Sequence, residues 1–370
     1  MKKLLSMLLV LAMVVAMSAV AFAEDADKAA AAAVDEQIAA IQVQERTEET
    51  DALCAAAKAG WDALSDAQKE LVEEADYFGR DTGDAAADDP LNADDIGENE
   101  LLVVSFGTSF NDSRVTDIGG IEKALQAAYP DWSVRRAFTA QIIINHIAAR
   151  DGEQIDNVAQ ALDRAVANGV KKLVVQPTHL MHGAEYDELV ATLNDYTDKF
   201  EKVVVAEPLL GEVGADATVI NADKEAVAKA VVAAANVPED TALVLMGHGT
   251  SHTANVTYNQ MQTQMDNLGY KNVFIGTVEG EPEDTECSVV IGKVKDAGFK
   301  KVVLRPLMVV AGDHANNDMA DPEDEESWFS MFTADGSFES IECMIEGLGR
   351  IADVEALYVA HTAEAIAAIG

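Results

Sequence analysis

From residue 99 onward, short continuous apolar runs alternate with longer stretches of helical periodicity. The apolar runs have the length of strands and are rich in β-branched residues. Runs that are apolar at nearly every position are typical of strands buried on both faces. The alternation therefore predicts an α/β fold in which parallel sheets are flanked by helices. The candidate strands are 101–106, 132–138, 171–178, 202–209, 242–247, 272–279 and 301–310.

This α/β region contains an internal sequence repeat, which we call the echo. LLVVSFGTS at 101–109 matches ALVLMGHGTS at 242–251, and KKLVVQPTHLMHGAE at 171–185 matches KKVVLRPLMVVAGDH at 300–314. A duplication predicts two similar α/β domains that meet at a cleft, and a chance match is the alternative. We expect the first domain at 99–236, the second, with a metal site, at 237–350, and a C-terminal helix at 351–370.

Reactive residues follow the apolar runs of the second half. His248, Glu279 and His314 all stand where a strand should end, and ligands of open α/β sheets lie beyond the carboxyl ends of the strands. In the first half the echo puts Phe106 at the place of His248 and Glu185 at the place of His314. Two imidazoles and a carboxylate suit a divalent transition metal, and they could equally move protons. Local packing is the structural alternative.

The chain has five further histidines. His252 is a second candidate ligand or an exposed capping residue, and His179 and His182 could line the cleft from the first half. His146 and His361 are predicted to lie on helix surfaces. No GxxxxGK[ST] or GxGxxG motif follows a strand, which predicts that no nucleotide is used. A net charge of −39 argues against binding to nucleic acid.

The chain begins with a different kind of segment. A positive start and an apolar run that ends in Ala21-Phe22-Ala23 predict a signal peptide at 1–23 and export of a protein starting at Glu24. A retained membrane anchor is the alternative; after cleavage we expect no integral membrane protein. Residues 24–80 predict helices, and this stretch resembles a helical module of exported Gram-positive proteins that serves attachment or spacing. The acidic residues 81–98 predict a linker.

Several motifs taken together resemble those of one enzyme family. LLVVSFGTSF, RRAFT, THLMHGAEYDEL, LMGHGTSH and above all PLMVVAGDHANNDMADPEDEESW are similar to the anaerobic, CbiK-type cobalt chelatases of the class II chelatase family. The resemblance runs from about residue 99 to the C-terminus. It implies two similar α/β domains around a cleft, with a C-terminal helix that returns to the first domain. It also implies ATP-independent insertion of Co²⁺ into sirohydrochlorin, a tetrapyrrole.

The resemblance also implies roles for individual residues. The family's metal-binding and catalytic His, Glu and His fall on His248, Glu279 and His314, with Co²⁺ as the substrate metal and Fe²⁺ or Ni²⁺ as chemical alternatives. Segments that border the tetrapyrrole cleft make four residues candidates for substrate contact: Phe106, Thr108, His179 and Met181. Arg135, Arg136 and Arg305 are expected to offset the carboxylates of the substrate.

An exported copy leaves a second function open. Corrinoid synthesis is expected in the cytoplasm, so the chain could instead be an exported protein that binds or transports haem or a metal tetrapyrrole. The set of His248, Glu279 and His314 favours the enzyme. The sequence leaves the oligomeric state open, a homo-oligomer included.

Overall fold

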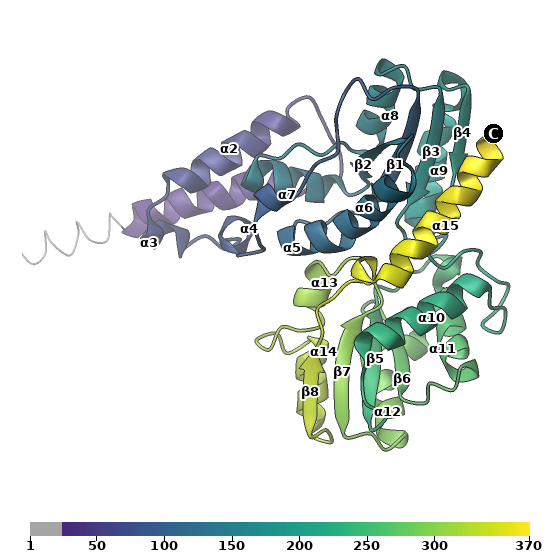
Figure 1. Cartoon of the computed structure of the whole chain (residues 1–370). Helices are drawn as coiled ribbons and strands as arrows, with labels where there is room; N and C mark the ends of the chain where they lie inside the picture. The colour runs from purple at the N-terminus through teal and green to yellow at the C-terminus, as the bar shows by residue number, and fades with distance from the viewer. Residues whose placement is uncertain (1–23) are drawn as a thin grey trace, which may run out of the picture. The chain divides into compact units, whose positions relative to one another are not determined.

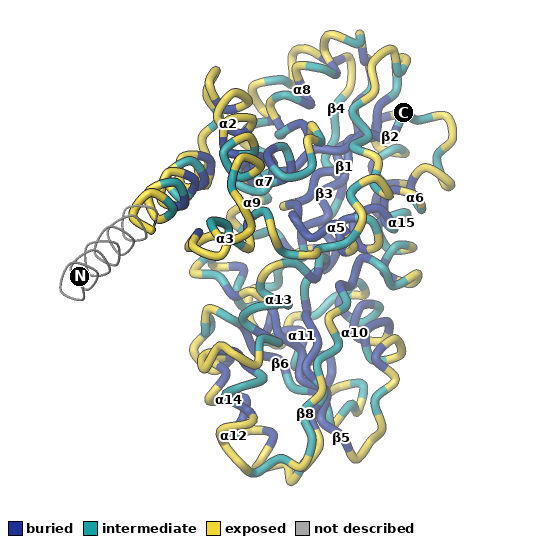
Figure 2. The backbone as a smooth tube through the Cα atoms, turned by 90° about the vertical axis from the view of Figure 1, so that its left-hand side faces the viewer, coloured by how far each residue is buried: buried dark blue, intermediate teal, exposed yellow. Residues whose placement is uncertain are grey.

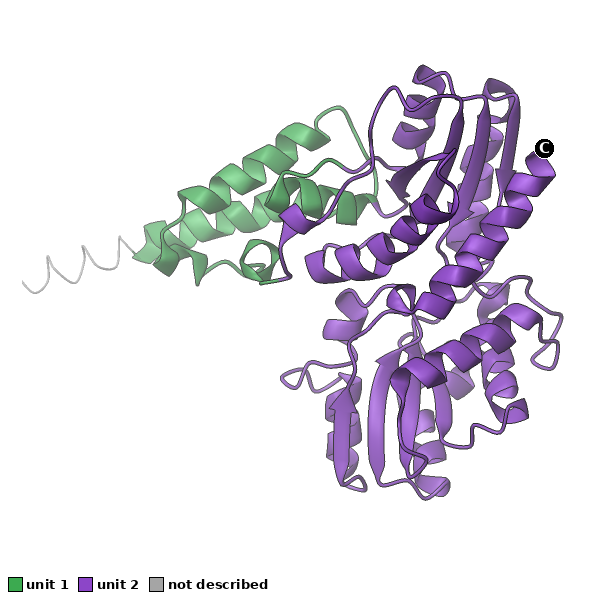
Figure 3. Cartoon of the chain, in the orientation of Figure 1, with its two compact units in different colours: residues 1–81, 141–154 green, residues 82–140, 155–370 purple. Residues whose placement is uncertain are grey.

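The computed structural model describes residues 24–370, so the predicted signal peptide lies outside the described part of the chain. The chain forms two compact units (Figure 3). We call residues 24–81 with 141–154 the helical unit, and residues 82–140 with 155–370 the α/β unit. Among residues 24–370, none of the helices combines the length and apolarity that a membrane crossing needs.

The helical unit collects helices from two separate parts of the sequence. A helix runs through residues 24–39. It is followed by α2 (Thr50–Ala63), α3 (Asp66–Lys69) and α4 (Asp76–Gly79), and the unit is completed by α7 (Gln141–Asp151). The amide of Asn145 on α7 donates to the carbonyl of Ile41 over 2.9 Å, and the His146 ring stacks on Tyr77 at 3.8 Å between centroids. The predicted first domain included α7, whereas the contacts group it with the N-terminal helices.

The α/β unit holds two four-stranded sheets, and every neighbouring pair of strands in them is parallel. The first sheet has the order β2-β1-β3-β4 and the second β6-β5-β7-β8 (Figure 1). The predicted class, parallel sheets flanked by helices, is confirmed. The strands are β1 (Asn99–Ser105), β2 (Ser133–Phe138), β3 (Lys172–Pro177), β4 (Lys202–Val205), β5 (Thr241–Gly247), β6 (Val273–Thr277), β7 (Lys301–Pro306) and β8 (Ser340–Cys343).

Helices connect successive strands in both halves of the unit. The longer ones begin with side-chain caps where the sequence provides them: Asn157 caps α8, and Asn221 caps α10. The α-helices of the unit are α5 (Asn111–Ser113), α6 (Gly119–Ala128), α8 (Val158–Ala167), α9 (Ala184–Asn194), α10 (Ala222–Ala235), α11 (Val256–Asn267), α12 (Cys287–Asp296), α13 (Asp313–Asn316), α14 (Trp328–Asp335) and α15 (Ala352–Ile369). Shorter turns include the π-helix η2 (Arg114–Ile118) and the 3₁₀ turn η4 (Thr253–Asn255).

The two sheets repeat one another in topology and in register. In each sheet the first strand along the chain lies between the second and the third. Val104 of β1 pairs with Pro177 of β3, and Met246 of β5 pairs with Pro306 of β7. These pairs occupy the same positions in the two matching sequence segments. The shared register supports the interpretation of the internal echo as a duplication.

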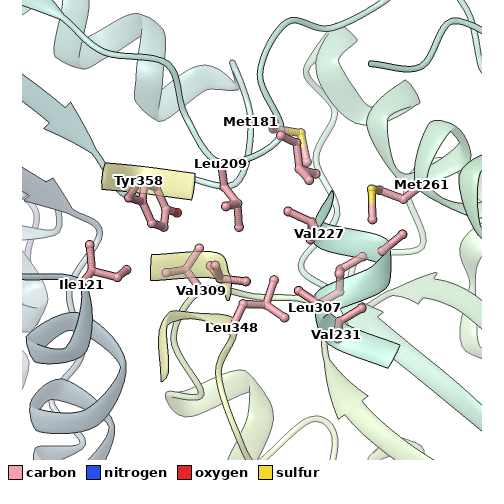
Figure 4. Close-up of a cluster of buried hydrophobic side chains, with 14 of the residues drawn as sticks. Ile121, Met181, Leu209, Val227, Val231, Met261, Leu307, Val309, Leu348 and Tyr358 are labelled. Carbon is pink, nitrogen blue, oxygen red and sulfur yellow. The ribbon is translucent and has the colours of Figure 1, made fainter. Parts of the chain in front are cut away.

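One hydrophobic core joins the two halves. It contains side chains of the first half, such as Ile121 and Met181, and of the second, such as Met261 and Leu307 (Figure 4). Tyr358 of α15 is fully buried in the same cluster, and α15 packs against α6, β3, β4 and α10. Apart from the edge strands β4 and β8, the strands of both sheets are buried along most of their length (Figure 2). Because the halves share this core, they form one compact unit.

The predicted linker contains an anchored residue. The Asp88 carboxylate is 3% exposed and receives hydrogen bonds from the guanidinium groups of Arg114 and Arg136, each at 2.6 Å. These ion pairs fasten Asp88 to the α/β unit, and the assignment of 81–98 as a linker stays a prediction.

Candidate active site

The Gly247-His248-Gly249 turn ends the inner strand of the second sheet. Gly249 has a φ of +94°, a conformation that side chains disfavour, and a Cβ there would lie 2.8 Å from the Cβ of Glu279. The carbonyl of His248 accepts a hydrogen bond from the backbone N–H of Glu279 over 2.9 Å. The turn therefore places His248 and Glu279 side by side at the ends of β5 and β6, and both side chains are exposed.

His248 and His314 are in contact. Their rings meet edge to face with centroids 4.6 Å apart. The Nδ1 atom of His248 lies 2.8 Å from the carbonyl oxygen of Gly249. Because a carbonyl only accepts, this Nδ1 carries the proton and Nε2 keeps its lone pair. The same holds for His314, whose Nδ1 lies 2.7 Å from a carboxylate oxygen of Asp318. Each ring thus presents an Nε2 that can bind a cation.

Short helix α13 positions His314 after the Val-Val-Ala-Gly loop that follows β7. Asp318 stands one turn further on and fixes the orientation of the ring. The hydrogen bond to Asp318 is the main cause that raises the pKa of His314, against the opposing effect of burial. The Glu279 carboxylate also acts on this pKa, which places it within electrostatic range of His314.

The three predicted metal ligands therefore gather at one edge of the second sheet. Within residues 24–370, no three His, Cys, Asp or Glu side chains enclose a common point closely enough to hold a metal ion. His248 and Glu279 are exposed and His314 is partly exposed, so the set is open to solvent. An open set of nitrogen and oxygen donors can accept a metal and can also release it.

The first half presents a different surface at the corresponding turn. Phe106, at the place of His248, exposes 44% of its surface. Gly107 follows with a φ of +103°, and a Cβ at this position would lie 2.5 Å from the ring of Phe138, so glycine is required. Thr108 is buried, and its Oγ1 lies 2.9 Å from the point where a Cβ on Gly312 would stand. The turn of the first half thus touches the loop that carries His314.

The remaining predicted contact residues lie deeper. His179 is buried after β3, its ring nitrogens have no hydrogen-bond partner, and burial lowers its pKa to about 4. Its Nε2 atom is 3.6 Å from Glu185, beyond hydrogen-bond distance. Met181 belongs to the hydrophobic core rather than to an open surface. Partial burial and the neighbouring Glu188 raise the pKa of Glu185.

Two of the further histidines lie beside carboxylates. His252 caps η4 by accepting the N–H of Ala254, and its Nε2 lies 3.4 Å from Asp187 of α9. His182 pairs with Glu207 at 2.7 Å and contacts the ring of Tyr186. For His252 the structure therefore favours the capping residue over a further ligand.

Two predictions about surface residues are wrong. His361 is buried, with its Nε2 atom 3.2 Å from Asp223, instead of lying on a helix surface. The three arginines expected to meet the substrate are at most 1% exposed: Arg135, Arg136 and Arg305. Arg135 pairs with Glu100 and Asp156, and Arg136 pairs with Glu122 and Asp88. These guanidinium groups neutralise buried carboxylates of the protein itself.

Sequence reasoning missed two residues that support the site, Asp318 and Tyr258. Asp318 stands four residues after His314, a spacing that places both on one face of a helical turn. Tyr258 belongs to no motif that the sequence reveals. Its hydroxyl oxygen accepts the N–H of Gly249 over 3.0 Å, a contact that only the folded chain reveals.

Comparison with known proteins identifies the family. The model of the family described as cobalt chelatase (CbiK) matches residues 99–367. Sirohydrochlorin cobaltochelatase of Salmonella typhimurium is 34% identical over 266 residues, which cover 72% of this chain and 96% of that protein. Sirohydrochlorin cobaltochelatase CbiKC of Nitratidesulfovibrio vulgaris is 30% identical over 275 residues, or 73% and 91% of the two chains.

A solved structure resembles the chain more distantly. The sirohydrochlorin chelatase SirB of Bacillus subtilis subspecies spizizenii, in complex with cobalt, is 14% identical with a TM-score of 0.48, over 73% of this chain and 95% of that chain.

Two repeated parallel sheets, with a pair of imidazoles in contact at the strand ends of the second, are features that suit a protein that binds transition metals. The extent of the family match goes further: the chain belongs to the CbiK family of cobalt chelatases.

Proposed function

We propose that this protein inserts Co²⁺ into sirohydrochlorin without ATP. The observation that carries the proposal is the His248–His314 contact, in which both Nδ1 atoms are engaged and both Nε2 atoms are left to bind a cation. The family match supplies the metal and the tetrapyrrole, because the curated relatives bear the name sirohydrochlorin cobaltochelatase.

His248, His314 and Glu279 are proposed as the residues that receive the metal. Hydrated Co²⁺ must lose water before it can enter the ring, and imidazole nitrogens are suitable replacements for that water. The Glu279 carboxylate adds negative charge beside the two neutral imidazoles. The exposure of His248 and Glu279 to solvent supports a transit role, because a substrate metal has to leave the site again.

Metal insertion also releases protons. The ring exchanges two N–H protons for one Co²⁺, so two protons must pass to bases or to water. An imidazole from which the metal departs regains a free Nε2 lone pair and can accept one of them. Glu279, which is exposed beside His248, is the second proposed acceptor and can pass its proton to solvent.

Phe106 is proposed as part of the wall that holds the macrocycle. Among residues 24–370, few large apolar side chains are exposed, and Phe106 is one of them. It occupies the position in the first half that His248 occupies in the second. An aromatic face is suited to stack on a flat ring. Roles for Thr108, His179 and Met181 in substrate contact remain predictions. These residues are buried, so they would shape the wall from behind.

The test is an anaerobic insertion assay on the chain from Glu24, with sirohydrochlorin, Co²⁺ and absorption spectroscopy. We expect rapid metallation that His314→Ala reduces by at least about a hundredfold, and that His146→Ala, in the helical unit, leaves intact. Parallel runs with Fe²⁺ and Ni²⁺ determine the metal preference. Absence of metallation in the unsubstituted protein, together with tight binding of haem, would instead identify a tetrapyrrole carrier.

We also propose that residues 1–23 are a signal peptide, so that the reaction takes place outside the cytoplasm. The positive start, the apolar run and the Ala-Phe-Ala ending support this proposal. Mass spectrometry of the protein recovered from its native cells should give an N-terminus at Glu24. An intact Met1 would contradict export by cleavage.

A further inference from the structure

The Gly-His-Gly turn is clamped between two elements of the second half. On one side the N–H groups of Val278 and Glu279 donate to the carbonyls of Gly247 and His248, each over 2.9 Å. On the other side lies Tyr258, the third residue of α11, which is 3% exposed. The turn that carries His248 therefore has no freedom to shift toward either neighbour.

The sequence of the turn is adapted to Tyr258. A Cβ on Gly247 would lie 2.3 Å from Cε1 of the tyrosine ring, so only glycine fits at the end of β5. Beyond the ring, the tyrosine hydroxyl reaches the backbone of the turn and accepts the N–H of Gly249 over 3.0 Å. A buried N–H that lost this acceptor would be left without compensation.

The same glycine links the tyrosine to the imidazole. The carbonyl of Gly249 accepts the Nδ1–H of His248 over 2.8 Å, while its N–H is held by Tyr258. Fixing the backbone of Gly249 thus fixes the acceptor that selects the tautomer and the ring orientation of His248. In metal sites, a group that orients a histidine through its second nitrogen affects metal affinity without touching the metal.

We propose that Tyr258 is a positioning residue for metal insertion, acting on His248 through Gly249. The inference deepens the proposed function and rests on it, because it assumes that His248 receives the metal. The hydroxyl, rather than the ring, carries the role. The ring belongs to the same core cluster as Met261 and Leu307 and packs against Gly247, whereas only the hydroxyl bonds the N–H of Gly249.

The test is Tyr258→Phe, which keeps the ring and removes the hydroxyl. Binding of Co²⁺ is measured by titration, from the visible absorption of the bound ion, and the insertion rate is measured against the concentrations of Co²⁺ and sirohydrochlorin. We expect Co²⁺ to bind about three- to tenfold more weakly, which corresponds to the loss of one hydrogen bond. The KM for Co²⁺ should rise by the same factor, and the KM for sirohydrochlorin should stay unchanged.

Tyr129→Phe is the matched control. Its hydroxyl also bonds the backbone, here by donating to the carbonyl of Val359, where the end of α6 meets α15. The control should lose a similar amount of thermal stability and no Co²⁺ affinity. Equal Co²⁺ binding by Tyr258→Phe and the unsubstituted protein would overturn the proposal, as would equal increases in both KM values.

The titration also separates the two proposals. It needs no tetrapyrrole, so it reports on Tyr258 even if the unsubstituted protein fails to metallate sirohydrochlorin. A protein that binds Co²⁺ in a Tyr258-dependent way but inserts none would refute the proposed function alone.

Discussion

Asp318→Asn is the substitution that tests the metal site most directly. The change keeps the size of the side chain and an oxygen that can accept the Nδ1–H of His314, now held at 2.7 Å, and it removes the negative charge. The pair is partly exposed, with 38% of the His314 side chain and 41% of the Asp318 side chain accessible. An ion pair so exposed contributes about 0–1 kcal/mol to folding, so the melting temperature should hardly change.

Metal affinity should respond far more than stability does. A carboxylate on Nδ1 increases the basicity of Nε2, and loss of such a partner costs about 10- to 100-fold in metal affinity. Because solvent screens the pair, we expect a change near the lower limit, about tenfold. The assay is the KM for Co²⁺ in the insertion reaction, together with a direct Co²⁺ titration.

The control for this substitution lies on the same acidic loop. Asp324→Asn removes the same charge, and Asp324 caps the backbone N–H of Glu326 instead of contacting a histidine. The control should leave Co²⁺ affinity almost unchanged. If both variants weakened Co²⁺ binding equally, the general negative field of the loop would be responsible, and the assigned role of Asp318 would be wrong.

Three further predictions concern folding and substrate binding. Burial raises the pKa of Glu100 to about 7, above its value in the unfolded chain. This carboxyl therefore destabilises the fold by up to about 3 kcal/mol as pH rises from about 4.5 to about 7. Over that range, urea unfolding should show that Glu100→Gln gains stability relative to the unsubstituted protein. Asn145→Ala should cost about 1–3 kcal/mol and make residues 24–81 more sensitive to limited proteolysis than the sheets, because the hydrogen bond to Ile41 is lost. With a net charge of −39, the protein should repel a polycarboxylate substrate, so its KM for sirohydrochlorin should fall as ionic strength rises.

Most of the α/β architecture could be predicted because its strands are apolar throughout. All seven candidate strands correspond to β1–β7. The strand that escaped prediction, β8 (Ser340–Cys343), lies at the edge of its sheet, is four residues long and is only partly buried, so its sequence lacks an apolar run. The duplication predicts this strand, because the first half has a fourth strand, β4, at the same place in its sheet.

The site was predictable to the extent that it depends on strand ends. Parallel strands bring their carboxyl ends to one edge, which is why His248, Glu279 and His314 could be grouped without any motif that joins them. The partners of charged side chains could not be predicted. From the sequence, Arg136 is expected to be a free cation that faces the substrate. Its two carboxylate partners, Glu122 and Asp88, come close to it only when the chain folds.

The duplication explains why the two halves present corresponding but unlike turns. Both halves end their inner strand in a turn that requires a glycine of positive φ, Gly107 in one and Gly249 in the other. In the first half the turn is fixed from the sheet, where Ser105 bonds Thr178 across β1 and β3 at 2.6 Å and Phe106 is left exposed. In the second half Gly247 takes the place of Ser105 and admits the Tyr258 ring.

The difference between the two turns therefore lies in a few side chains on a common backbone. One turn exposes an apolar ring that suits a flat macrocycle, and the other exposes an imidazole whose free nitrogen suits a metal. An enzyme that brings a metal to a tetrapyrrole needs one surface of each kind. In the function proposed above, a duplicated α/β unit provides both, because its two copies differ at the positions of Phe106 and His248.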